Sequence, residues 1–114
     1  MPHIVVEHST EGHARFDAAA LMRALHAAAA GTGVVQAADL KIRVMAYTDY
    51  LVAGTRDGFC HVSLYLLDGR TPAQKVLLSE ALRAAMVAML PQTKSLSVDI
   101  RDMDAVAYKK RLLD

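Results

Sequence analysis

The sequence has little of what several classes of protein require. Cysteine occurs once in 114 residues, as Cys60, so no internal disulfide can form, which suits a reducing compartment. Tryptophan is missing, and four tyrosines and two phenylalanines are too few to build base-stacking platforms. Thirteen basic residues nearly balance twelve acidic ones, for a net charge of +1. We therefore expect no nucleic-acid partner.

Long hydrophobic runs are also missing. The longest apolar stretches, residues 27–30 and 84–90, are far shorter than the ~20 residues that cross a bilayer. The N-terminus lacks the basic flank and apolar centre of a signal peptide. We expect a soluble cytoplasmic protein with no membrane partner. Its 54% hydrophobic and 22% charged residues fit one globular domain with a two-layer core.

Metal and phosphate motifs are not found either. The five histidines include no His-x-x-x-His pair and no flanking cysteine cluster, and no glycine-rich phosphate loop occurs. We therefore predict no metal, and hydrogen-bonding roles for His3, His8, His13, His26 and His61. Ser9 and Ser63 have no visible triad partners.

Hydrophobic periodicity predicts six regular elements. Asp17 is a plausible N-cap for the first helix, which Gly31 and Gly33 end. Thr71 opens a capping box before the second helix, and Pro91 ends it. The predicted strands cover 2–6, 40–53, 59–67 and 96–101, and the predicted helices cover 18–30 and 72–90.

The order of these elements is β-α-β, a turn, and β-α-β again. Within each half the two strands should be parallel and joined by a right-handed crossover. We predict one α+β domain over residues 1–114, with a first unit at about 2–53, a second at about 59–102 and a tail at 103–114. The tail is charged and is either a short helix or an arm. Two helices would cover one face of a four-stranded mixed sheet, and apolar residues assigned to both faces would favour an oligomer.

The first candidate for chemistry is Pro2. If Met1 is removed, as is usual before a small residue, Pro2 carries a free secondary amine. An α-amino group titrates near pH 8, and burial or nearby cations lower its pKa. The neutral amine would then exchange protons near neutral pH. If Met1 is retained, the Pro2 nitrogen is an amide and has no basic lone pair.

Three cations are candidates for binding an anion. Lys41 and Arg43 are two residues apart on a predicted strand, which places them on one face about 7 Å apart. Arg70 directly precedes the N-terminus of the second helix, where the dipole and open N–H groups favour an anion. The alternatives are a solvated face for the first pair and a salt bridge from Arg70 to Asp68 or Glu80.

Two further polar residues lie on predicted strands. His61 shares a strand face with Phe59, Ser63 and Tyr65, near the sheet surface where a ligand could lie. Glu7 would orient a substrate or form an ion pair, and we favour the ion pair.

Taken together, four segments resemble the 5-carboxymethyl-2-hydroxymuconate Δ-isomerase family of the tautomerase superfamily. They are Pro2-His3-x-x-Val6-Glu7, Lys41-x-Arg43-Val44, Phe59-x-His61-Val62-Ser63-Leu64 and Gly69-Arg70. The resemblance implies a homotrimer whose sheets surround a central barrel, with sites near the subunit interfaces. It also implies a cofactor-independent isomerase that acts on an unsaturated 2-hydroxy or 2-keto dicarboxylic acid.

The resemblance assigns roles to four residues. Pro2 matches the catalytic base, Arg70 matches an arginine implicated in carboxylate binding, and Arg43 matches the second of two arginines spaced by one residue. Lys41 stands where the first of those arginines is expected, and an ammonium group keeps the charge but loses the bidentate grip on a carboxylate. Substrate preference would then differ, or activity would be weak. Dehalogenation or decarboxylation on the same scaffold, and a catalytically silent ligand-binding module, are the alternatives.

Overall fold

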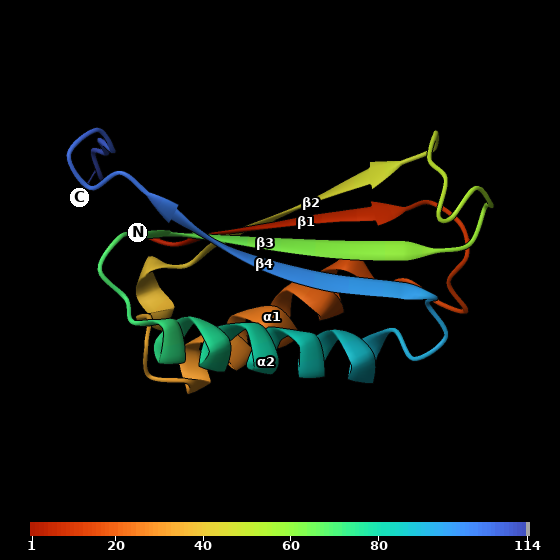
Figure 1. The fold of residues 1–114 in the computed structure, drawn as a ribbon, viewed down its shortest axis with the longest axis horizontal. Helices are drawn as coiled ribbons and strands as arrows, with labels where there is room; N and C mark the ends of the chain where they lie inside the picture. Colours follow the sequence, from red (N-terminus) through yellow and green to blue (C-terminus); the bar gives the residue numbers. More distant parts are fainter. Residues whose placement is uncertain (114) are drawn as a thin grey trace.

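The computed structural model describes residues 1–113 and contains the predicted elements in the predicted order (Figure 1). A short 3-10 helix between α1 and β2 is the one addition. The elements are β1 (His3–Ser9), α1 (Ala18–Gly31), η1 (Ala37–Asp39), β2 (Lys41–Tyr47), β3 (Phe59–Leu67), α2 (Pro72–Met89) and β4 (Ser95–Met103).

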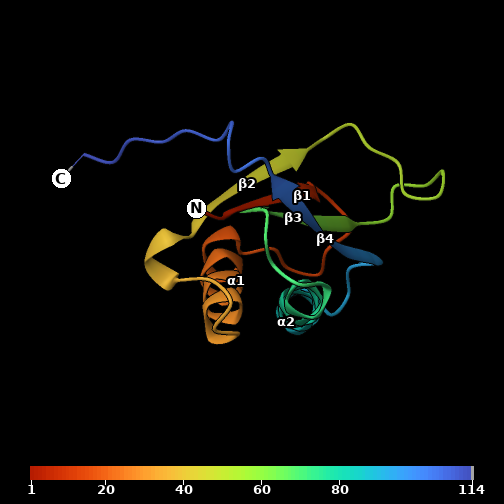
Figure 2. The ribbon, with the colours of Figure 1, turned by 60° about the vertical axis from the view of Figure 1, so that its left-hand side comes forward.

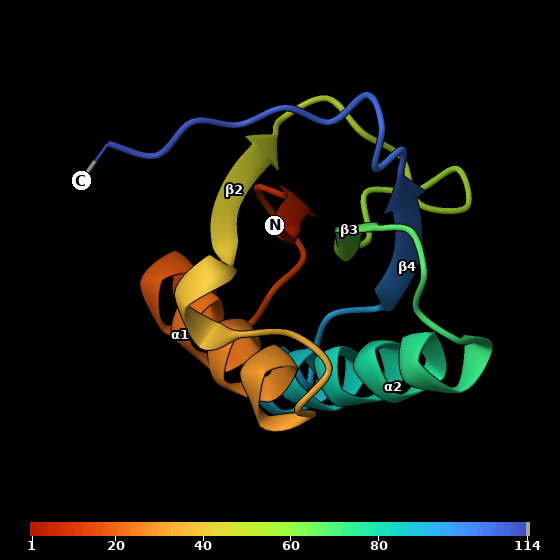
Figure 3. The ribbon, with the colours of Figure 1, turned by 90° about the vertical axis from the view of Figure 1, so that its left-hand side faces the viewer.

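The four strands form one mixed sheet in the order β2-β1-β3-β4. β1 is parallel to β2, β3 is parallel to β4, and β1 and β3 are antiparallel neighbours at the centre. Both helices lie on the same side of this sheet (Figures 2 and 3). The predicted tandem β-α-β architecture, with two helices on one face of a mixed sheet, is confirmed.

Side chains cap both helices as predicted. The Asp17 carboxylate accepts a hydrogen bond from the Ala20 N–H at 3.0 Å. At the start of α2, the Gln74 N–H donates to the Thr71 hydroxyl at 3.2 Å, and the Thr71 N–H donates to the Gln74 side chain at 2.9 Å. This reciprocal pair satisfies two N–H groups that the first turn leaves open, and so fixes where α2 begins.

The hydrophobic core lies between the sheet and the two helices. Alternate residues of the central strands meet residues of α1 and α2 at helical spacing. Cys60 is fully buried among them, and this burial raises the pKa of its thiol to about 12, so it acts as a small hydrophobic residue. The fully buried members with large side chains are Ile4, Val6, Leu21, Leu25, Val62, Leu64, Leu66, Leu78, Leu82 and Met86.

The uncovered face of the sheet is mostly polar, but Val5, Leu67 and the rings of Tyr47, Phe59 and Tyr65 also lie on it, so the prediction of apolar residues on both faces holds only in part. Strand alternation directs the aliphatic residues toward the helices and leaves mainly charged, hydroxyl and aromatic groups on the other side. The strand residues of this open face are His3, Val5, Glu7, Ser9, Lys41, Arg43, Met45, Tyr47, Phe59, His61, Ser63, Tyr65, Leu67, Ser95, Ser97, Asp99, Arg101 and Met103.

Four boundaries differ from the prediction. β1 runs to Ser9 rather than to residue 6, because Glu7 to Ser9 still pair with β2. β2 ends at Tyr47 rather than near residue 53, and the chain continues as a loop containing one bridge, Val52 to Thr55. β4 extends to Met103, because its whole length pairs with β3. Residues 104–113 contain a single turn and no helix, so of the two predicted forms, a short helix or an arm, the tail adopts the second. They are called the C-terminal arm below. Neither α1 nor α2 is long and apolar enough to cross a membrane.

The contribution of the core can be measured on one helix. Leu82 is fully buried and Leu77 is 47% exposed, both within α2. We expect Leu82→Ala to lower the free energy of unfolding by about 2–5 kcal/mol, because it removes buried methyl groups and leaves a cavity. Leu77→Ala, the matched control, should change it by less than about 1 kcal/mol. Urea denaturation measures both values, and equal losses would contradict the assignment of the core.

Candidate active site

The topology brings four of the five predicted site residues, all except His61, to one end of the sheet. The parallel strands β1 and β2 begin at this end, and β3 and β4, which run the opposite way, finish there. The Lys41 N–H donates to the Pro2 carbonyl at 3.1 Å, which places the two residues side by side. Arg70 follows the end of β3. Pro2, Lys41, Arg43 and Arg70 therefore share this region, called the basic end below.

The amino terminus lies in a positively charged environment at the basic end. The pKa of the Met1 amino group is below its ordinary value, first because of burial and then because Lys110, Arg70 and Lys41 oppose a further positive charge. Asp39 acts in the opposite direction and raises this pKa. The next residue, Pro2, is buried. An amine here is therefore driven toward its neutral, proton-accepting form.

Arg43 lies on the open face beside His3. Its guanidinium donates to Nδ1 of His3 at 3.2 Å. Burial, followed by the charges of Arg43 and Lys41, lowers the pKa of His3. A small cavity of about 290 Å³ lies here, lined by His3, Val5, Arg43, Tyr65 and Met103. The predicted alignment of Lys41 and Arg43 on one face is confirmed, since they pair with His3 and Val5 of β1.

Arg70 forms neither of the salt bridges considered for it. Its guanidinium donates to the Leu67 carbonyl at 3.2 Å, and within residues 1–113 it has no ion pair with Asp68 or Glu80. Lys75, a few residues away, does have an acidic partner, Asp102, at 2.9 Å. The positive charge of Arg70 is thus left uncompensated beside the amino terminus, where it is available to an anion.

His61 does not lie at the basic end. It pairs with Glu7 across β1 and β3, which places it five residues from Pro2, or about 16 Å along the strand. Its Nδ1 contacts the Ser97 hydroxyl at 2.7 Å. Glu7 accepts a hydrogen bond from the Tyr47 hydroxyl, and this contact raises the pKa of Tyr47. Glu7 forms no ion pair among residues 1–113, so the expectation of an ion pair was wrong.

A larger cavity lies at this opposite end of the open face. It has a volume of about 620 Å³, and its lining includes Glu7, Asp49, Phe59 and His61 but neither lysine nor arginine. Two carboxylates without a cation repel an anionic ligand. We therefore place the candidate site at the basic end, although the cavity beside Arg43 is smaller and its lining does not include Pro2, Lys41 or Arg70.

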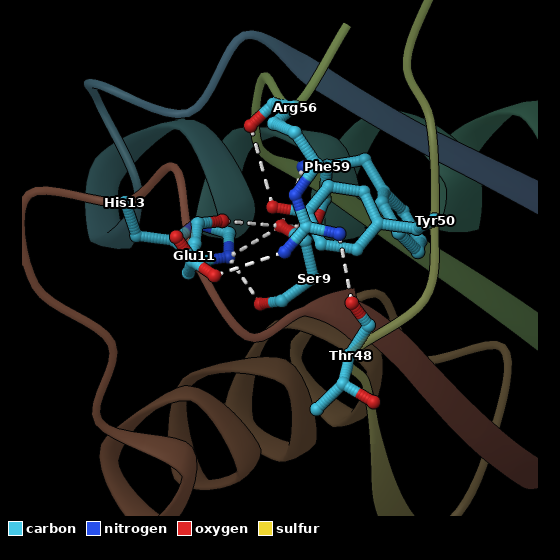
Figure 4. A network of polar contacts seen from close by, with 7 residues as sticks. All are labelled: Ser9, Glu11, His13, Thr48, Tyr50, Arg56 and Phe59. Atoms are coloured by element: carbon cyan, nitrogen blue, oxygen red, sulfur yellow. Dashed lines mark hydrogen bonds and ion pairs between the residues drawn. The ribbon is translucent and has the colours of Figure 1, made fainter.

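Ser9 and His13 meet in a buried network that has a structural role (Figure 4). The Ser9 hydroxyl lies 3.1 Å from His13 Nε2, but it donates to the Glu11 carbonyl at 2.7 Å and accepts the Phe59 N–H at 2.9 Å. His13 also contacts the Thr93 hydroxyl at 2.6 Å. Because Ser9 is fully buried, no substrate reaches its hydroxyl. The network joins the end of β1 to the start of β3.

Arg56 links the loop between β2 and β3, residues 48–58, to the segment that follows β1. Its guanidinium donates to the Glu11 carboxylate at 2.9 Å and to the Thr48 carbonyl at 2.8 Å, and lies 4.2 Å from the centre of the Tyr50 ring (Figure 4).

No group of three or more histidine, cysteine, aspartate or glutamate side chains that could hold a metal ion occurs among residues 1–113.

Sequence reasoning missed two residues of the basic end, Tyr108 and Lys110. The Tyr108 hydroxyl lies 2.9 Å from His3 Nε2, and Lys110 is one of the charges acting on the amino terminus. No local signal predicts a contact between residues 105 positions apart.

The family follows from comparison with known sequences. The profile describing 5-carboxymethyl-2-hydroxymuconate isomerase matches residues 2–112. The chain belongs to this family. Membership agrees with the resemblance noted in four short segments and extends it over nearly the whole chain. The family is one of isomerases. No curated protein matches the sequence.

Solved structures show that the fold is shared with family members and other tautomerases. A 5-carboxymethyl-2-hydroxymuconate isomerase from Deinococcus radiodurans R1 is 19% identical, with 96% of this chain and 88% of that chain covered and a TM-score of 0.84. A 5-carboxymethyl-2-hydroxymuconate delta-isomerase is 23% identical over 98% and 88%, with a TM-score of 0.79. A fused 4-OT, solved as a wild-type symmetric trimer, is 28% identical over 90% and 85%, with a TM-score of 0.77.

The charge environment of the amino terminus is testable without any assay of turnover. We expect Lys41→Gln to raise the pKa of the amino-terminal amine, because one of the cations that oppose its protonation is lost. At pH 7 less of the amine is then neutral, so an amine-reactive reagent should modify the N-terminal peptide about twofold more slowly, as followed by mass spectrometry.

Lys94→Gln is the matched control for this measurement. Lys94 binds Asp57 at 3.2 Å, at the opposite end of the sheet, and is not among the charges acting on the amine. An equal change in both variants would contradict a specific effect of Lys41.

Proposed function

We propose that this protein is a cofactor-independent isomerase that moves a proton along an unsaturated 2-hydroxy or 2-keto dicarboxylic acid resembling 5-carboxymethyl-2-hydroxymuconate. The observation that carries the proposal is an amino terminus beside Lys41, whose N–H donates to the Pro2 carbonyl at 3.1 Å. Burial, followed by the charges of Lys110, Arg70 and Lys41, lowers the pKa of the Met1 amine there. Membership of the isomerase family supports the reaction class.

In this proposal the base is the nitrogen of Pro2 after removal of Met1. Removal moves the free amine from a half-buried residue to a buried one. The same cations remain nearby, and the greater burial opposes the charged form further. The neutral secondary amine then accepts a proton near neutral pH, as general-base catalysis requires.

The reaction is a proton transfer with no net change in oxidation state. Pro2 nitrogen removes a proton from the 2-hydroxyl group or from carbon, and the released electron pair spreads over the conjugated system as a dienolate. The protonated proline returns the proton three atoms along. Arg70, Arg43 and Lys41 bind the carboxylates and stabilise the negative charge as it develops. Conjugation within the substrate spreads this charge, so the proposed steps require no cofactor.

We also propose that the working form is a homotrimer. The similar fused 4-OT is a symmetric trimer. In a trimer the open faces would be brought together around a central axis. Because these faces are polar, the enclosed groups would form hydrogen bonds and ion pairs rather than an apolar core.

The base is tested by Pro2→Ala in protein whose intact mass shows that Met1 has been removed. We expect kcat/KM with a 2-hydroxymuconate-type dicarboxylate to fall by at least about tenfold, because a primary amine replaces the secondary amine of the base. In the wild type, kcat/KM should rise with pH through the lowered pKa of the amine, since only the neutral form accepts a proton, and the midpoint should lie below about 8.

Two results would contradict the base. Undiminished turnover in processed Pro2→Ala would show that the secondary amine is not needed. Full activity in protein that retains Met1 would exclude the Pro2 nitrogen as the base, because that nitrogen is then an amide. A processed wild type that binds the dicarboxylate without turning it over would support the silent binding module instead.

The carboxylate-binding role is tested by Arg70→Ala. We expect KM for the dicarboxylate to rise by about tenfold, because a charge-assisted hydrogen bond to the substrate is lost. Arg83→Ala is the matched control, since Arg83 lies on α2 away from the basic end and lines a different cavity, with Ser79 and Glu80. Steady-state kinetics of both variants make the comparison, and equal KM values would place the anion site elsewhere.

A further inference from the structure

The C-terminal arm starts at the basic end, where β4 finishes. From Asp104 onward it runs along the side of the sheet opposite the helices (Figures 2 and 3). The Val106 N–H donates to the Asp104 carboxylate and the Tyr108 N–H donates to the Asp104 carbonyl, both at 2.9 Å. This turn directs the arm back toward the start of β1.

Tyr108 is the point at which the arm is attached. It is half-buried, whereas the other residues from Asp104 to Leu113 are exposed. Its ring packs edge-on against His3, with 5.9 Å between the ring centres and 71° between the planes, and its hydroxyl lies 2.9 Å from His3 Nε2.

The direction of these hydrogen bonds follows from the chemistry of the donors. A guanidinium group only donates, so Nδ1 of His3 must accept the bond from Arg43 and cannot carry a proton. The neutral imidazole then carries its proton on Nε2 and donates it to the Tyr108 oxygen. In this series of hydrogen bonds, Arg43 donates to His3 and His3 donates to the Tyr108 oxygen, so the hydroxyl hydrogen of Tyr108 remains free to donate. Among residues 1–113 this hydrogen has no acceptor.

Lys110 lies two residues beyond this attachment point. Of the charged groups acting on the amino terminus, which are Lys110, Asp39, Arg70 and Lys41, it has the largest influence. It forms no ion pair with residues 1–113. The adjacent Lys109 is not among these groups.

We propose that the C-terminal arm forms part of the substrate site and determines its selectivity for dianions, with Tyr108 donating a hydrogen bond to a substrate carboxylate and Lys110 supplying a further positive charge. The proposal rests on the proposed function and assigns two specificity-determining residues to it. Lys41 is paired with His3 in the sheet, and Tyr108 binds His3, so the Tyr108 hydroxyl and Lys41 belong to the same part of the open face. In the proposal the hydroxyl adds a second donor where the single ammonium lacks the fork of an arginine.

The test compares two six-carbon acids that differ by one carboxylate, adipate and hexanoate, in isothermal titrations with the full chain. We expect the wild type to prefer adipate. Tyr108→Phe keeps the ring contact with His3 and should weaken adipate binding by about tenfold, because a hydrogen bond to a charged group is lost. Lys110→Ala should weaken it by about two- to fivefold. In both variants the preference for adipate over hexanoate should fall.

Lys109→Ala is the matched control, because it removes the same charge from the neighbouring position. It should leave the preference for adipate unchanged, and all three variants should melt at the wild-type temperature, since each site is exposed or keeps its ring. As a second readout, Lys110→Ala, but not Lys109→Ala, should raise the pH at which the amino-terminal amine becomes reactive.

Every result decides the role of the arm. An unchanged adipate preference in either Tyr108→Phe or Lys110→Ala, an equal loss in Lys109→Ala, or a wild type that does not bind adipate would overturn the proposal. If the wild type turns over the muconate-type substrate and KM is unaltered in both variants, the proposed role of the arm is wrong and the proposed isomerase activity still stands. If adipate binding depends on Tyr108 and Lys110 but no turnover is found, the role of the arm is supported and the proposed reaction is wrong.

Discussion

The hydrogen-bonded pairing of β1 with β3 is the constraint on which the site depends. Within one β-α-β unit the two strands are parallel, so both begin at one end of the sheet and both finish at the other. Because β1 and β3 are antiparallel, the start of the first unit lies beside the end of the second. This arrangement places Arg70 and the C-terminal arm beside the amino terminus, at a distance of about seventy residues or more along the chain.

The site concentrates positive charge, and in the described part of the chain Asp39 is the one carboxylate among the charged groups that act on the amino terminus. Within residues 1–113, Lys41, Arg43, Arg70 and Lys110 form no ion pair, whereas Arg56, Lys75, Lys94 and Arg101 each bind a carboxylate. Such crowding opposes protonation of the amine and also attracts a dianion. The same charges therefore serve both a base and an anion site, since a bound dicarboxylate offsets the repulsion among them.

The polar open face changes the reason for association. If aliphatic side chains occupied both faces, burial alone would favour an oligomer. Instead, a network of tyrosine, histidine, serine and charged groups lies there, and Tyr47–Glu7 and His61–Ser97 are already paired within one chain. Association through such a face depends on matching hydrogen bonds, which makes it more specific than apolar contact.

The sequence by itself determined the elements, because its signals are local. Capping at Asp17 and Thr71, helical spacing and strand alternation are each read within a few residues, and they predict both β-α-β units and the shared face of Lys41 and Arg43. Only the tertiary structure decided which of these groups meet. The register of β3 against β1 places His61 at the end of the open face opposite the basic end. Tyr108 contacts His3 although 105 residues separate them in the sequence. Strand register and long-range contacts depend on the packing of the whole sheet, and a short stretch of sequence does not specify that packing.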